Sequence, residues 1–344
     1  MARILIIRLS ALGDVAMTVP VVYSLAEQYP QHEITVLSRK GMRVLFQQLP
    51  SNVHFFEADF KNVYKGLPGL KDLYTKLKNE QFDYVADLHD VLRSKCLRFY
   101  FRWAGVPVAA ICKGRAGKKR LVRRRCKVFE PQKSSFQRYA DVLEVLGLPV
   151  KLNFSSVYGE GKGDFSQIAS ITGKKGEQVW IGIAPFAKHK GKIYPLELQE
   201  QIVSHFAAKP ATQVFLFGGG KEEEEVFLRW SAKYPSVHSL IRKVNLHTEL
   251  DLMSYLDVML SMDSANMHLA SLVHTPVVSI WGATHPYAGF MGWQQQPEHI
   301  VQVDLSCRPC SVYGQKSCWR GDYACLYMIT PEQVIEKIEQ VINK

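Results

Sequence analysis

The sequence predicts an α/β protein built of two Rossmann-like domains, each a parallel sheet covered by helices. Its 344 residues exceed one ordinary domain and suit two domains of roughly 150 residues each. Short apolar segments alternate with helical ones, which is typical of a doubly wound parallel sheet. The alternation restarts near residue 160, after a connecting region rich in Gly, Ser and Lys. We therefore expect domains over residues 1–160 and 161–330, followed by a C-terminal helix over 331–344.

The first half opens on an apolar strand over residues 4–9, which runs into a loop containing Gly13 and Asp14. A short apolar run of this kind is typical of a buried parallel strand. Further apolar segments predict strands at 34–37, 53–57 and 84–88. Helical spacing of apolar residues predicts helices at 19–29, 69–79 and 136–146.

The second half repeats this pattern after a linker and a first helix expected within residues 155–176. Strands are expected at 178–185 and 213–217, and helices at 196–208, 222–234 and 331–342. Segments 256–273 and 275–282 combine apolar runs with a polar loop. The glycines at 218–220 match neither the dinucleotide fingerprint nor a Walker loop, so neither assignment is supported.

Positive charge is concentrated in the first half of the chain. Residues 1–150 contain 25 Lys and Arg against 13 Asp and Glu, whereas the rest contains 18 against 19. The basic segment, residues 113–127, holds nine basic residues and no acidic one. Such a run attracts phosphate groups on nucleic acid, an anionic membrane or a phosphorylated glycolipid. The alternative is a solvated, partly mobile loop without a ligand.

The start of the chain shows neither a signal peptide nor a run of about 18 apolar residues that could span a membrane. We therefore expect a cytoplasmic protein.

Asp14 has two interpretations. An Asp before a helix commonly caps its N-terminus. In open α/β sheets, however, ligands bind in the crevice outside the carboxyl ends of the strands, which is where Asp14 is expected.

Four segments together resemble the ADP-heptose:lipopolysaccharide heptosyltransferases, glycosyltransferase family 9. They are RLSALGDVAMTVPVVYSL from residue 8, APFAKHKGKIYP from 184, LFGGGKEEEE from 216 and SMDSANMHLASLVHTPVVSIWGATHP from 261. The resemblance spans nearly the whole chain. It implies the GT-B architecture, in which two Rossmann-like domains face each other across a cleft that holds the substrates.

The resemblance also implies an inverting transfer of heptose from ADP-heptose to an inner-core sugar, with no catalytic cofactor or metal. Asp14 matches the family's general base. Cations and backbone N–H groups must then stabilise the departing ADP. The donor residues implied are Lys192, Asp263, Ser264, Ala265, Asn266, His268 and a ribose-binding glutamate, Glu222 or Glu223. A buried core histidine is the alternative for His268.

The acceptor is expected to bind the first domain. The matching residues are His89 and Arg93, to which we add Arg123, Arg124 and Arg125 of the basic segment. The expected partners are an ADP-sugar, a phosphorylated glycolipid and, peripherally, the cytoplasmic face of the inner membrane.

Four of the seven cysteines, Cys307, Cys310, Cys318 and Cys325, form a C-x2-C-x7-C-x6-C pattern. This spacing suits a structural zinc site in a protein of the reducing cytosol. Free buried thiols and a disulfide are the alternatives.

Two other function classes compete with a glycosyltransferase. A nucleic-acid-binding protein with a four-cysteine zinc module would explain the basic segment, but not Asp14, Lys192 and the loop at 263–266 together. A nicotinamide-dependent oxidoreductase lacks its glycine fingerprint here. We therefore expect no nucleic-acid partner.

Overall fold

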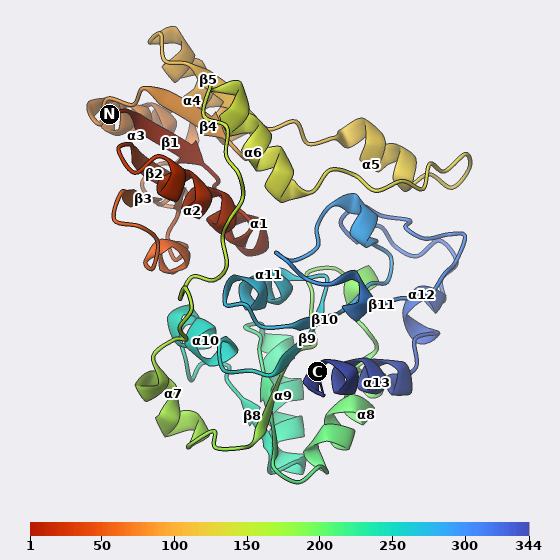
Figure 1. Cartoon of the computed structure of the whole chain (residues 1–344). Coiled ribbons are helices and arrows are strands. Elements are labelled where there is room, and N and C mark those ends of the chain that lie inside the picture. The colour runs from red at the N-terminus through yellow and green to blue at the C-terminus, as the bar shows by residue number, and fades with distance from the viewer. Residues whose placement is uncertain (344) are drawn as a thin grey trace. The chain divides into compact units, whose positions relative to one another are not determined.

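The computed structural model describes residues 1–343 and divides the chain into two compact units (Figure 1). Unit 1 comprises Met1–Lys113 and Lys133–Val157, and unit 2 comprises Gly114–Gln132 and Tyr158–Lys344. The chain therefore leaves unit 1 for the segment 114–132 and returns before its final crossing at residue 157.

Unit 1 is a five-stranded parallel sheet of order β3-β2-β1-β4-β5. Its central strand is almost wholly apolar, and Ile4 to Ile7 are completely buried, as expected for a strand covered on both faces. The strands are β1 (Arg3–Ile7), β2 (Glu33–Arg39), β3 (Val53–Ala58), β4 (Tyr84–Asp87) and β5 (Val108–Ala110). The helices are α1 (Leu12–Ala16), α2 (Val19–Gln28), η1 (Arg43–Phe46), α3 (Gly66–Asn79), α4 (Leu92–Trp103) and α6 (Ser135–Val145).

Unit 2 contains a six-stranded parallel sheet of order β11-β10-β9-β6-β7-β8. The strands are β6 (Val179–Ala184), β7 (Thr212–Leu216), β8 (Val237–Ser239), β9 (Val258–Met262), β10 (Val277–Ile280) and β11 (Ile300–Val301). The helices are α5 (Arg115–Leu121), α7 (Phe165–Thr172), η2 (Lys190–Lys192), α8 (Leu196–Ala207), α9 (Lys221–Lys233), α10 (Leu246–Met253), α11 (Ala265–Leu272), η3 (Pro286–Ala288), η4 (Pro297–His299), α12 (Ala324–Tyr327) and α13 (Pro331–Ile342). Two parallel sheets covered by helices confirm the predicted fold class.

Local sequence fixes several helix ends. The Ser134 hydroxyl accepts a hydrogen bond from the Gln137 N–H at the start of α6. Thr330 and Gln333 form a reciprocal capping box that begins α13. Helix α13 then packs on α8 of unit 2, with Val334 and Ile338 in that unit's core. The C-terminal helix therefore belongs to unit 2.

Apart from Lys113, the basic segment packs with unit 2, not with the first domain as the predicted boundary implied. Residues 115–121 form helix α5, and Lys118 is only 6% exposed. The charge imbalance between the halves disappears with this assignment, because unit 1 contains 18 Lys and Arg against 12 Asp and Glu and unit 2 contains 25 against 20. Within residues 1–343, no helix is long and apolar enough to cross a membrane.

Candidate functional site

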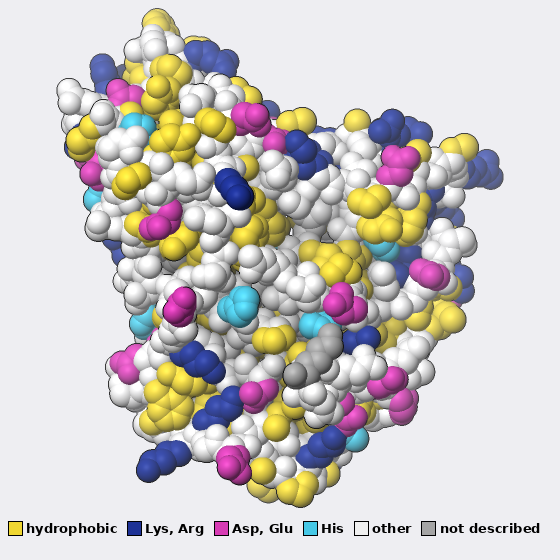
Figure 2. All heavy atoms as spheres, viewed as in Figure 1, with side chains coloured by type: hydrophobic (Ala, Val, Ile, Leu, Met, Phe, Trp, Pro, Cys, Tyr) yellow, Lys and Arg dark blue, Asp and Glu magenta, His cyan; other side chains and the backbone are white. Residues whose placement is uncertain are grey.

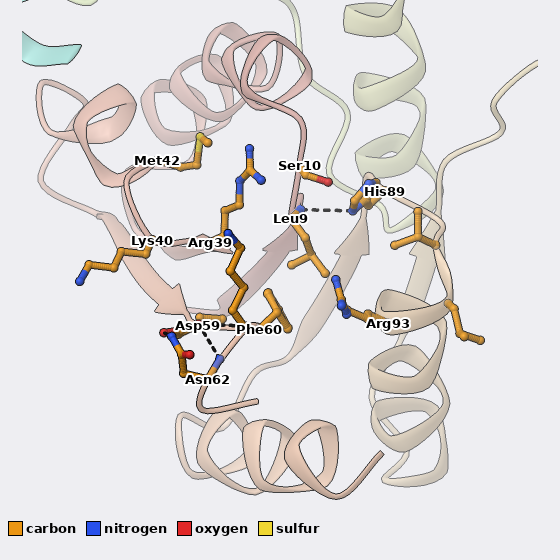
Figure 3. A pocket seen from close by; sticks show the side chains of 14 residues that line it. Leu9, Ser10, Arg39, Lys40, Met42, Asp59, Phe60, Asn62, His89 and Arg93 are labelled. Carbon is orange, nitrogen blue, oxygen red and sulfur yellow. Dashed lines mark hydrogen bonds between the residues drawn. The ribbon is translucent and has the colours of Figure 1, made fainter. Parts of the chain in front are cut away.

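Unit 1 contains a pocket of about 980 Å³ at the carboxyl ends of its strands (Figure 3). Leu9 and Ser10 follow β1, Arg39 ends β2 and Lys40 follows it, and His89 follows β4. The remaining lining residues come from the segment after β2, the β3–α3 segment and the start of α4: Met42, Ala58, Asp59, Phe60, Lys61, Asn62, Val91, Leu92 and Arg93. The pocket lies where ligands of parallel α/β sheets bind.

Asp14 is outside the set of residues that line the pocket, but its charge acts on the lining residue His89, and its carboxylate is held from two sides. The Arg8 guanidinium contacts its Oδ1 at 2.8 Å, and the Ala11 N–H donates to Oδ2 at 3.2 Å. Asp14 is the third residue of α1, and the N-cap is Ala11. Asp14 therefore contributes to capping only by accepting the hydrogen bond from the Ala11 N–H. Its side chain remains 39% exposed. A carboxylate fixed in orientation and open to solvent can accept a proton from a bound hydroxyl.

Arg8 is the residue that organises this site. It interrupts an otherwise apolar run and is buried. Besides Asp14, it donates from Nη1 to the Leu88 carbonyl at 2.7 Å and lies over the Tyr139 ring. Arg8 comes directly after β1 in the chain, and Leu88 comes directly after the adjacent strand β4. The signal in the sequence was a single charged residue within the apolar run of residues 4–9.

His89 is buried and electrically neutral at physiological pH. Burial, with the positive charges of Arg8 and Lys113, lowers its pKa to about 3. The Leu9 N–H donates to its Nδ1 at 3.3 Å, so the ring proton lies on Nε2. Because His89 lines the pocket, this N–H is available as a donor to a bound sugar oxygen.

The loop after β4 is tied down by Asp87. Its Oδ1 accepts hydrogen bonds from the backbone N–H groups of His89 and Asp90, both at 2.9 Å. Arg98 contacts Asp87 and Asp90 at 3.5 and 3.2 Å. These contacts fix the backbone that carries His89.

Four cations line the pocket together with apolar groups. They are Arg39, Lys40, Lys61 and Arg93, and the Arg93 guanidinium lies 5.4 Å from the centre of the Phe60 ring. Asn62 donates to Asp59, which orders the loop after β3. Of these residues only Arg93 was predicted. The others lie at or after the ends of two separate strands, β2 and β3, and only the fold brings them together with Arg93.

Unit 2 brings a lysine and an aspartate together at the carboxyl edge of its sheet. Lys192, on the segment after β6, places its Nζ 2.9 Å from Oδ2 of Asp263, directly after β9. Their side chains are 15% and 6% exposed. Gly314 packs on the lysine stem, where an added Cβ would lie 2.5 Å from Lys192 Cγ. The two predicted donor residues therefore form one buried ion pair.

Four other predicted donor residues follow Asp263 in the chain. Ser264 is the N-cap of α11, and its hydroxyl lies 3.2 Å from that of Ser261. Ala265 and Asn266 form the first turn, whose backbone N–H groups attract anions. His268 lies about one turn further along α11 and is buried. Its two predicted roles, donor ligand and core residue, both remain predictions.

The glutamates after the glycine loop have different environments. Glu223 accepts a hydrogen bond from the Gly219 N–H at 2.7 Å, and Glu224 contacts Arg242 at 2.8 Å. Glu222 is exposed in the first turn of α9. Glu222 is therefore the better candidate for a ribose ligand, and Glu223 orders the loop.

The basic segment makes specific contacts within unit 2. Lys118 Nζ lies 4.0 Å from the Phe290 ring centre, and the Arg124 guanidinium lies 4.1 Å from that of Trp319. Lys127 donates to the carbonyls of Ser306, Arg308 and Pro309. Arg123 and Arg125 remain exposed (Figure 2 shows such surface Lys and Arg side chains). Part of the segment is therefore ordered, whether it binds a ligand stays a prediction, and the grouping of these arginines with the first domain changes to unit 2.

The four clustered cysteines are free thiols in this structure. Cys325 is buried, which raises its pKa to about 12, and burial also raises the pKa of Cys310. Within residues 1–343 no three His, Cys, Asp or Glu side chains form a group that could hold a metal ion. The thiols thus do not form the expected zinc site in the arrangement described.

Comparison with known proteins identifies the family. The glycosyltransferase family 9 (heptosyltransferase) profile matches residues 71–319, most of the chain. The chain belongs to glycosyltransferase family 9.

Family 9 relatives match along nearly the full length. Lipooligosaccharide heptosyltransferase 2 of Campylobacter jejuni is 23% identical over 340 residues, covering 96% of both chains. The lipopolysaccharide core heptosyltransferase OpsX of Haemophilus influenzae is 27% identical and covers 82% of this chain and 79% of OpsX. The Escherichia coli ADP-heptose lps heptosyltransferase II structure superposes with a TM-score of 0.73 at 18% identity, covering 99% and 98%. This chain is therefore a transferase of the heptosyltransferase family, a family of lipopolysaccharide core synthesis.

Proposed function

We propose that this enzyme transfers a heptose from ADP-heptose to a phosphorylated inner-core sugar of a lipid-anchored acceptor. Unit 2 binds the donor, and the pocket of unit 1 binds the acceptor. The observation that carries the proposal is the buried Lys192–Asp263 pair beside the first turn of α11. The heptosyltransferase II of E. coli, which has the same fold, is described as acting with ADP-heptose.

The donor site suits a nucleoside diphosphate sugar. A diphosphate leaving group gains negative charge as the glycosidic bond breaks, and that charge must be stabilised. Lys192 supplies a point charge, and the N–H groups of Ala265 and Asn266 supply further donors. Asp263 then accepts hydrogen bonds from donor hydroxyls, and Glu222 from the ribose. Because the protein supplies these groups itself, we propose that the transfer requires no metal.

Asp14 is the proposed general base. Inversion requires the acceptor oxygen to attack from the face opposite the leaving ADP while one base accepts its proton. Arg8 and the Ala11 N–H hold both carboxylate oxygens of Asp14, and this fixes the direction from which it can accept a proton. His89 Nε2–H is placed to donate to a neighbouring acceptor oxygen.

The acceptor pocket suits an anionic sugar. Arg39, Lys40, Lys61 and Arg93 provide positive charge, and Phe60 provides an apolar surface for a sugar ring. A lipid-anchored acceptor would place the reaction at the cytoplasmic face of the inner membrane.

The first test is donor binding followed by transfer. Calorimetry with ADP, ADP-heptose, UDP-glucose and NAD should show binding of the two adenosine diphosphate ligands, weakened in Lys192→Ala. Transfer to a phosphorylated inner-core acceptor should persist in EDTA. Binding of NAD but not ADP-heptose, or complete loss of transfer in EDTA, would contradict the proposal.

The second test isolates the base. Asp14→Asn should abolish transfer and leave ADP-heptose affinity largely unchanged, because the base acts in the transition state. Asp72→Asn, an exposed acid on α3, is the matched control. A near-normal rate for Asp14→Asn would remove this residue from the role.

A further inference from the structure

Helix α4 carries apolar residues on two opposite faces, only one of which packs against the protein core. At 100° per residue, Leu97 and Phe101 fall on one face, and both are buried in the core of unit 1. The opposite face carries Leu92, Cys96, Phe99 and Trp103, hereafter the α4 face. Apolar residues therefore occur both on the side that packs and on the side that does not.

The α4 face is unusually exposed for its composition. Leu92, Phe99 and Trp103 are 78%, 60% and 81% exposed. Phe99 and Trp103 contact each other edge to face, with ring centres 5.9 Å apart. Burial of these groups is favourable at roughly 25 cal/mol per Å² of apolar surface, so an exposed cluster of this kind indicates an interaction surface.

Basic residues flank this face, and one of them, Lys95, also lies 3.6 Å from Oδ1 of Asp90, the residue directly before the segment 91–110. Lys95 and Arg102 project along one flank and Arg93 along the other, by the same 100° spacing, and all three are exposed. Residues 91–110 contain no Asp or Glu. Figure 2 shows hydrophobic and basic side chains interspersed at the end of unit 1 where Figure 1 places α4. Trp, Phe and Leu bordered by Lys and Arg are typical of helices that lie in an anionic membrane interface.

The α4 face is continuous with the acceptor pocket. Leu92 and Arg93 both begin α4 and line the pocket. Two more exposed apolar residues, Val63 and Leu67, follow the pocket residues Phe60 to Asn62. Arg93 contacts Phe60, which places this second segment next to the start of α4. An apolar, basic surface therefore extends from the pocket rim along the helix for about 18 Å, the length of twelve helical residues.

The geometry points to α4 as the surface by which this protein docks on an anionic phospholipid bilayer. Phe99 and Trp103 enter the headgroup region, and Lys95 and Arg102 contact lipid phosphates. Leu92 then meets the lipid surface at the entrance of the pocket. The link to a lipid-anchored acceptor rests on the proposed function, whereas binding to the bilayer does not.

Vesicle binding tests the docking surface directly. The full-length protein should float with vesicles of phosphatidylethanolamine and phosphatidylglycerol and much less with vesicles of phosphatidylcholine alone. Phe99→Ser/Trp103→Ser should weaken binding at least about tenfold. Lys95→Gln/Arg102→Gln should weaken it about fivefold per residue at low salt, and less at high salt.

A matched variant controls for a general change in surface hydrophobicity. Leu228→Ser/Tyr327→Ser removes two apolar side chains of unit 2 that are 59% and 56% exposed, and should bind vesicles like the wild type. An equal loss of vesicle binding in Phe99→Ser/Trp103→Ser and in Leu228→Ser/Tyr327→Ser would overturn the inference. So would wild-type protein that binds no anionic vesicle, or a dimer that dissociates in Phe99→Ser/Trp103→Ser, because a second copy would then cover the face.

Two acceptor forms separate this inference from the proposed function. Phe99→Ser/Trp103→Ser should lower transfer to an acceptor embedded in anionic vesicles and leave transfer to a delipidated acceptor unchanged. An equal effect on both acceptors would overturn the docking role. Wild-type protein that binds anionic vesicles but transfers to neither acceptor would support docking and contradict the proposed function.

Discussion

Removal of Lys192 should destabilise unit 2 and weaken donor binding for two separable reasons. Lys192→Ala leaves the Asp263 carboxylate without its partner at 6% exposure. Deletion of one partner of a buried ion pair costs about 3–5 kcal/mol. Because the lysine is 15% exposed, water can partly reach the site, and we expect about 3 kcal/mol. Lys188→Ala, a lysine of the same segment, should change stability by less than about 0.5 kcal/mol.

The double variant Lys192→Ala/Asp263→Ala distinguishes the two reasons. It leaves no unpaired charge, so its loss of stability should be about 2 kcal/mol smaller than the sum of the two single losses. Donor binding should not recover, because the charge that stabilises the diphosphate is still absent. The measurements are urea unfolding followed by fluorescence and calorimetric titration with ADP.

Two results would refute this reasoning. Additive losses in the double variant would show that the two side chains do not stabilise each other. Donor affinity that recovers together with stability would show that Lys192 only supports the structure and does not bind the diphosphate.

Three further predictions concern other parts of the chain. His89 has a pKa of about 3 when folded, below its ordinary value of 6.5, so stability should fall as the pH drops below about 6.5. In His89→Gln, measured by urea unfolding at several pH values, this slope should decrease by up to about 1.4 kcal/mol per pH unit. Arg308 donates to the carbonyls of Trp281, Gly282, Val303 and Thr284, so Arg308→Leu should cost about 3–5 kcal/mol of unfolding free energy, and a loss below about 1 kcal/mol would contradict this network. A thiol reagent should modify the exposed Cys112 and Cys126 rapidly and the buried Cys325 slowly, and release of stoichiometric zinc during the reaction would instead support the metal site.

The central strands of both sheets could be predicted because their residues are almost continuously apolar. Residues 4–9 and 178–185 predicted β1 and β6 to within a few residues. The edge strands β5, β8 and β11 contain only two or three residues each, too few to show a pattern. Helix α5 was not predicted, because its one fully buried apolar side chain is Leu121 and its burial depends on distant contacts such as Lys118 with Phe290.

The candidate sites were predicted residue by residue but not as arrangements. Asp14 follows an apolar strand, a position that suggested a site but left an N-cap open, and Asp263 was assigned through the resemblance to glycosyltransferase family 9. That Lys192 pairs with Asp263 could not be predicted, since the two residues lie far apart in sequence and meet only because β6 and β9 are neighbours. Arg39 and Lys61 were missed for the same reason, because β1, β2 and β3 bring their loops together.

The position of the basic segment changes how anionic acceptor groups are expected to be recognised. Since it packs on unit 2, the cations of the proposed acceptor pocket are Arg39, Lys40, Lys61 and Arg93, and the exposed arginines 123–125 form a separate set. Long-range attraction by exposed charges is screened within about 10 Å at 0.1 M salt, whereas contacts inside a pocket are screened less. Neutralising Arg123, Arg124 and Arg125 to Gln should therefore weaken acceptor use about tenfold at low salt, and the difference should vanish at high salt. Arg39→Gln should instead weaken it at both salt concentrations. An effect of the triple variant that persists at high salt would show that these arginines contact the acceptor directly.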